Sequence, residues 1–125
     1  MVEDEPSVRV LVERVLTRRG YVVLTAANAA EAYEVVADHD RPIDMLLSDV
    51  LLPGGTLGRE MADTLRARQP QLPVLFMSGY ARDTIVRAGR LEADINFLEK
   101  PFTPDQLAKH VREVLDQGVN GSADG

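Results

Sequence analysis

The stretch Ile43-Asp44-Met45-Leu46-Leu47-Ser48-Asp49, which Val50-Leu51-Leu52-Pro53-Gly54-Gly55 follows, decides the fold class. Its first part is a mostly apolar run of strand length that ends at Asp49, and the Pro-Gly-Gly then breaks regular structure. A near-continuous apolar strand is typical of a parallel sheet that helices cover on both faces. We therefore expect a buried strand here, with Asp49 at its carboxyl end.

Helical and strand-like segments alternate on both sides of this strand. On the N-terminal side, helical spacing predicts a helix with an apolar stripe, then a strand over 21–25 and a helix to about residue 38; the stripe is Val8, Leu11, Val12, Val15 and Leu16. On the C-terminal side the expected order is a helix around 61–65, a strand over 73–77, a short or irregular helix over 83–90, a strand over 96–99 and a final helix from 104. Capping boxes at Asn28 and Thr103 mark two helix starts. The alternation predicts an α/β protein with a doubly wound parallel sheet, whose binding crevice lies at the carboxyl ends of its strands.

Length and composition narrow the class of protein. The 125 residues, 45% hydrophobic and 27% charged, suit one soluble domain, for which we expect residues 1–117, with 118–125 as a flexible C-terminal tail rich in Gly, Asn and Ser. The net charge of −6 argues against direct binding of nucleic acid. The absence of cysteine excludes disulfides, thiolate zinc sites and cysteine nucleophiles. No apolar run approaches the ~20 residues of a membrane span, so we expect no membrane insertion and a cytoplasmic location.

Chemically active side chains stand at four expected strand ends. Glu3 and Asp4 follow Met1-Val2, and Asp49, Ser78 and Lys100 each follow a further strand. Three converging carboxylates repel one another and need a cation, and a hard divalent ion such as Mg²⁺ suits oxygen ligands. Acids, a metal, a hydroxyl and an ammonium around one point form a site for phosphoryl transfer, in which a carboxylate can be the nucleophile.

Each of these residues also has a purely structural interpretation. Acids at 3–5 can complement the dipole of the helix that follows, and Asp49 can be a turn residue. Ser78-Gly79 is an ordinary turn pair, and a lysine before a proline is usually solvated. Their joint placement at strand ends favours the functional interpretation.

These residues match a known family: the sequence resembles the receiver domain of two-component response regulators, over about residues 1–117. The resemblance rests on Glu3-Asp4-Glu5, on Ser48-Asp49-Val50-Leu51-Leu52-Pro53-Gly54, on Phe76-Met77-Ser78-Gly79-Tyr80-Ala81 and on Leu98-Glu99-Lys100-Pro101-Phe102. Within this family, the sequence most resembles receivers of hybrid histidine kinases. The resemblance implies a flavodoxin-like, doubly wound, five-stranded parallel sheet of order 2-1-3-4-5.

The resemblance also implies a role for each residue. Asp49 would accept a phosphoryl group from a histidine kinase or a histidine phosphotransfer domain, and would later lose it, in self-catalysed steps without turnover of a separate substrate. Mg²⁺ would be held by Asp4 and Asp49, with Glu3 acting through water and with the carbonyl of Leu51. Ser78 and Lys100 would bind the phosphoryl oxygens. Phe97 takes the place of the family's switch aromatic, which moves with Ser78, although a core aromatic is an equal alternative. Lys100-Pro101 can adopt the cis peptide common in the family.

One feature departs from the family pattern, because only Met1 and Val2 precede the acids. We therefore expect a truncated first strand of marginal stability, or a gap that another copy of the chain fills; otherwise a monomer is expected. The length leaves no room for an output domain, so signalling passes by protein contact unless the chain is part of a longer protein. Two alternatives stay open: a pseudo-receiver that binds partners without phosphorylation, and a small flavodoxin-like ligand-binding domain, for which no Gly-rich phosphate loop or aromatic pair is found.

Overall fold

The computed structural model describes the backbone of residues 1–124 and the side chains of residues 1–117. Helices and strands follow one another in the order α1 (Pro6–Arg18), α2 (Ala29–Asp38), β1 (Leu46–Asp49), the 3-10 turn η1 (Pro53–Gly55), α3 (Gly58–Arg66), β2 (Val74–Ser78), α4 (Arg82–Arg87), β3 (Phe97–Glu99) and α5 (Pro104–Asp124). The α/β class and the alternation on the C-terminal side are confirmed.

The sheet has its strands in the order β1-β2-β3, all parallel. Beside β1, Val2 forms isolated parallel bridges to Ser48 on one side and to Ala26 on the other. Ala26, Val2, β1, β2 and β3 therefore lie side by side in the predicted order 2-1-3-4-5. In the first two of these positions, however, a single bridging residue, Ala26 or Val2, replaces a strand. The predicted strand over 21–25 is wrong as a regular strand, because Met1 and Val2 are too short a partner for a ladder to form.

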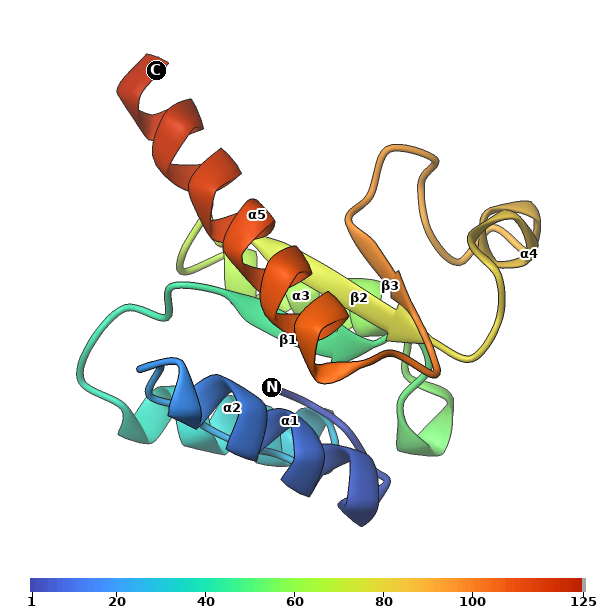
Figure 1. Ribbon diagram of the computed structural model, residues 1–125, viewed down its shortest axis with the longest axis horizontal. Helices are drawn as coiled ribbons and strands as arrows, with labels where there is room; N and C mark the ends of the chain where they lie inside the picture. Colours follow the sequence, from blue (N-terminus) through green and yellow to red (C-terminus); the bar gives the residue numbers. More distant parts are fainter. Residues whose placement is uncertain (125) are drawn as a thin grey trace.

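Helices cover both faces of this sheet (Figure 1). One core cluster joins α1 and α5 to the sheet through side chains that include Val12, Leu47, Leu75, Leu107 and Val111. The other joins α2 and α3 to the opposite face through side chains that include Ala32, Leu46, Met61, Phe76 and Leu72. The strands β1 and β2 are buried along their whole length, as a parallel sheet covered on both faces requires.

Local signals explain where the helices begin. The side chain of Asn28 accepts a hydrogen bond from Glu31 N at 2.9 Å at the start of α2. At the start of α5, Gln106 N donates to Thr103 Oγ1 at 3.1 Å and Thr103 N donates to the Gln106 side chain at 2.8 Å, so this capping box is reciprocal. On α1, Val12 and Leu16 are buried as predicted, but Leu11 is 40% exposed.

The last helix extends further than the sequence suggests. α5 runs to Asp124, past the predicted domain end at Gln117. The flexible tail over 118–125 stays a prediction, because side chains from 118 onward and the whole of Gly125 lie outside the described residues. No helix within residues 1–124 is long and apolar enough to cross a membrane.

A cavity of about 420 Å³ lies next to Met1, between residues 20–26 and 41–47. The α-amino group of Met1 donates to Leu24 O, and Val2 N donates to Leu47 O, both at 2.8 Å. Because pairing in a parallel ladder alternates between the two neighbours, the N–H groups of Leu24 and Leu47 face the place that a longer first strand would take. The cavity is therefore the part of the first strand position that Met1 and Val2 do not fill.

Candidate functional site

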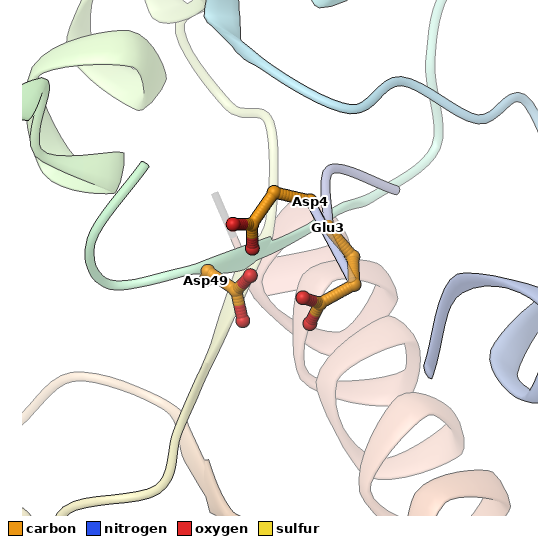
Figure 2. Close-up of side chains that lie close together, drawn as sticks. All are labelled: Glu3, Asp4 and Asp49. Atoms are coloured by element: carbon orange, nitrogen blue, oxygen red, sulfur yellow. The ribbon is translucent and has the colours of Figure 1, made fainter. Parts of the chain in front are cut away.

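Three carboxylates meet at the carboxyl end of β1. Glu3 and Asp4 follow the bridging residue Val2, and Asp49 is the last residue of β1, so that strand pairing alone brings them together. One carboxylate oxygen from each lies within 4.8 Å of the others, and Figure 2 shows the three groups turned toward a common point. Glu3 and Asp49 are buried, at 1% and 6% exposure, whereas Asp4 is exposed.

The Lys100 side chain neutralises the two buried acids. Its Nζ lies 2.5 Å from Oε2 of Glu3 and 2.7 Å from Oδ1 of Asp49. Lys100 follows β3, and its backbone N donates to Ser78 O at 2.7 Å, which continues the pairing of β3 with β2. The Lys100-Pro101 peptide is cis, as the resemblance implies.

Burial and these contacts change the pKa values of all three groups. Burial raises the pKa of Asp49 to about 7, the Glu3 carboxyl adds to the rise, and the Lys100 ammonium opposes it. Burial also acts to raise the pKa of Glu3, but hydrogen bonds with Asp49 and Lys100 outweigh it and hold this pKa below its usual value. For Lys100, burial acts to lower the pKa, and the two carboxylates raise it above the usual value. Of the two buried acids, Asp49 is therefore the one that takes up a proton first as the pH falls.

Ser78 ends β2 on the same edge of the sheet and is buried, at 8% exposure. Its hydroxyl oxygen accepts a hydrogen bond from Tyr80 N at 3.0 Å. A hydroxyl has one donor and two acceptor positions, so its proton stays available for an acceptor at the strand ends. This is the donor that a phosphoryl oxygen needs.

Leu51 and Phe97 are the two other predicted site residues. Leu51 follows β1 in the loop to α3 and forms an antiparallel bridge with Leu57, and its role as a carbonyl ligand stays a prediction. Phe97 begins β3, is partly buried and packs against the cluster that contains Phe76 and Ile85. This position suits the core alternative, and the switch role stays a prediction.

Two residues near Asp49 were not predicted as part of the site. Ser48 is completely buried, and its hydroxyl donates to Asp49 O at 2.9 Å. Gly58, at the start of α3, packs against the same carbonyl oxygen. The local sequence holds no signal for Gly58, because its contact with Asp49 forms only when the loop from β1 folds back.

The donor set suits a hard divalent cation. Carboxylate oxygens are the protein ligands that Mg²⁺ and Ca²⁺ prefer, and two of the three acids here are buried beside a single ammonium. The residues that could hold a metal are thus Glu3, Asp4 and Asp49.

Comparison with known proteins agrees with this geometry. The family model described as the response regulator receiver domain matches residues 1–112. The sensor kinase CckA of Brucella abortus is 41% identical over 120 residues, which are 94% of this chain and 12% of that protein. The nitrogen assimilation regulatory protein NtrX of Azorhizobium caulinodans is 32% identical over 117 residues, 93% of this chain and 25% of that protein. The chain thus spans a quarter or less of the length of these curated relatives.

Solved structures show the same likeness. The receiver domain from the hybrid histidine kinase CckA superposes with a TM-score of 0.74 at 37% identity, and the match covers 91% of this chain and 94% of that one. A response regulator receiver protein from Sinorhizobium medicae WSM419 gives a TM-score of 0.78 at 28% identity, with coverage of 94% and 92%. The chain belongs to the response regulator receiver domain family.

Proposed function

We propose that this domain accepts a phosphoryl group on Asp49 from the phosphohistidine of a histidine kinase or a histidine phosphotransfer domain. The observation that carries the proposal is the position of the Asp49 carboxylate, which is buried at the end of β1 in contact with the Lys100 ammonium that it shares with Glu3. A buried carboxylate with a charge partner and a nearby hydroxyl donor fits a nucleophile in phosphoryl transfer.

In the proposed step, an ionised Oδ of Asp49 attacks the phosphorus atom. The O–P bond of an acyl phosphate forms, the P–N bond of phosphohistidine breaks, and the electron pair leaves with the imidazole, which takes up a proton. Lys100 and Ser78 then donate hydrogen bonds to the phosphoryl oxygens, so that Lys100 exchanges part of its contact with Asp49 for contact with the new group. Mg²⁺ bound by Asp4 and Asp49, with Glu3 and the carbonyl of Leu51 in support, would supply positive charge for these oxygens.

The same site serves the return reaction, in which water attacks phosphorus and the Asp49 carboxylate is released. We propose that Ser78 and Phe97 report the phosphorylated state by moving together. The exchange takes place in the cytoplasm between a monomer of this chain and its phosphohistidine partner, without contact to nucleic acid, which the net charge of −6 disfavours.

The test is the intact mass of the protein after incubation with acetyl phosphate or phosphoramidate and Mg²⁺. The expected result is a mass increase of one phosphoryl group that requires Mg²⁺ and is absent in Asp49→Asn. Asp63→Asn, which alters an exposed acid on α3, is the matched control and should be modified like the wild type. An unmodified wild-type protein would instead favour a pseudo-receiver that acts by partner binding alone.

A further inference from the structure

The backbone carbonyl of Asp49 is enclosed by residues that the phosphoryl-transfer step does not use. Ser48 Oγ donates to this oxygen at 2.9 Å. A Cβ atom built on Gly58 would lie 2.2 Å from Asp49 O, 3.1 Å from Cε1 of Phe76 and 3.2 Å from Ser48 Oγ. A Cβ never comes within 2.2 Å of a backbone oxygen, so only glycine fits at this position.

The reason for glycine at this position is space and not backbone conformation. Gly58 does not belong to the glycines with positive φ, which are Gly20, Gly54, Gly55 and Gly89. Its φ is open to any residue, and what excludes a side chain is the closeness of the Asp49 carbonyl. Gly58 therefore allows α3 to begin in contact with the end of β1.

The same contact closes the loop between β1 and α3. Gly58 N donates to Val50 O at 2.7 Å, Leu52 N donates to Thr56 O at 2.9 Å, and Leu51 bridges Leu57. Residues 50–57 thus form a closed loop whose base is the packing of Gly58 on Asp49. A displacement at Gly58 must move either Asp49 or the loop that carries the Leu51 carbonyl.

We propose that Ser48 and Gly58 are positioning residues for the phosphoacceptor: Ser48 holds the Asp49 carbonyl by a hydrogen bond, and Gly58 leaves the room that this carbonyl occupies. This inference rests on the proposed phosphorylation of Asp49. A methyl group at position 58 would have to move roughly 1 Å away from the Asp49 carbonyl oxygen. This oxygen belongs to the backbone, so it cannot rotate aside as a side chain does. Misplacement by about 1 Å at a reacting group can reduce a rate by about a hundredfold.

The experiment compares wild type, Gly58→Ala, Ser48→Ala and the control Val114→Ala. Val114 is buried in the other core cluster, on α5, so its truncation lowers stability without contact to the loop. Three quantities are measured: the melting temperature, the Mg²⁺ affinity from a titration of amide NMR shifts, and the phosphorylation rate at saturating Mg²⁺.

We expect Gly58→Ala to lower the phosphorylation rate at saturating Mg²⁺ by about tenfold or more, and Ser48→Ala to lower it by a smaller factor in the same direction. Mg²⁺ affinity should fall in both variants and stay unchanged in Val114→Ala, even where the three melting temperatures fall alike. If Gly58→Ala does not fold, the comparison of Ser48→Ala with Val114→Ala decides.

The inference is overturned if the rates and Mg²⁺ affinities of the site variants stay within about twofold of Val114→Ala. This outcome differs from failure of the proposed function, in which the wild type gains no phosphoryl group at all. In that case the Mg²⁺ titration still tests whether Ser48 and Gly58 position the loop.

Discussion

Lys100 Nζ lies 2.7 Å from Oδ1 of Asp49, and this contact joins two strand ends that are 51 residues apart in the sequence. The ammonium lies beside both buried carboxylates, and in the proposed reaction it would also contact the phosphoryl group. The stability of the domain and its reactivity are therefore coupled through the same few charges.

Replacing Asp49 by Asn should stabilise the metal-free protein at neutral pH, on the order of 1 to 3 kcal/mol. The pKa of Asp49 is about 7 when folded, against an ordinary value of 3.8, so the unfolded state loses its proton more readily than the folded state. This group therefore lowers stability progressively as pH rises from about 4 to about 7, and the penalty is constant above that range. Urea midpoints of both proteins in EDTA should diverge across this range, with Asp63→Asn following the wild type. A lower midpoint for Asp49→Asn at pH 7 would show that the acids are not crowded.

Mg²⁺ should raise the melting temperature of the wild type, because a ligand that binds only the folded state stabilises it by mass action. The carboxylates of Glu3, Asp4 and Asp49 are the group of acids that could hold the ion. The rise should shrink in Asp49→Asn and in Asp4→Asn, and NaCl at the same ionic strength should not reproduce it. Equal rises in all three proteins would place the bound ion elsewhere.

Removal of the ammonium in Lys100→Gln should destabilise the metal-free domain by about 3 kcal/mol, because two buried carboxylates lose their charge partner. Mg²⁺ should restore part of this loss, since it supplies charge to the same oxygens. Thermal melts with and without Mg²⁺ measure both effects. A Lys100→Gln domain as stable as the wild type in EDTA would mean that Lys100 is not the counterion of these acids.

Much of the site followed from the sequence because it lies at strand ends. The apolar runs that end at Asp49 and Ser78 are the observed β1 and β2 to within a few residues, and a parallel sheet brings their ends to one edge. The sequence did not predict which of Glu3 and Asp4 is buried. The alternation of a strand would show which side chain turns inward, but this segment contributes only one bridging residue, Val2. The structure places Glu3, and not Asp4, in contact with Lys100.

Other features depend on contacts that no local pattern encodes. Gly58 looks like an unremarkable helix start until the loop from β1 folds back on Asp49. The run at 21–25 has the composition of a strand, but a strand also needs a neighbouring strand to pair with. The bridge on this side joins only Ala26, the next residue, to Val2.

An extension of about four or five apolar residues before Met1 should raise the urea midpoint, since the N–H groups of Leu24 and Leu47 would gain partners worth ~1 kcal/mol or more each.

Burial lowers the pKa of the Met1 α-amino group to about 6, so a chain that starts at Met1 also loses stability as pH falls from about 8 to 6. The extension should abolish this loss and tighten Mg²⁺ binding at Glu3 and Asp4. N-terminal acetylation is the control that removes the charge without filling the cavity. An unchanged midpoint and unchanged Mg²⁺ affinity would show that the first strand is already sufficient.

The most direct test of the account is to locate the phosphoryl group itself. Borohydride reduction of the phosphorylated protein converts an acyl phosphate to the alcohol, and peptide mass mapping then identifies the carboxylate that carried it. Homoserine is expected at position 49, with Glu3, Asp4 and Asp44 unreduced. Reduction at any other acid, with Asp49 intact, would contradict the assignment of Asp49 as the phosphoacceptor.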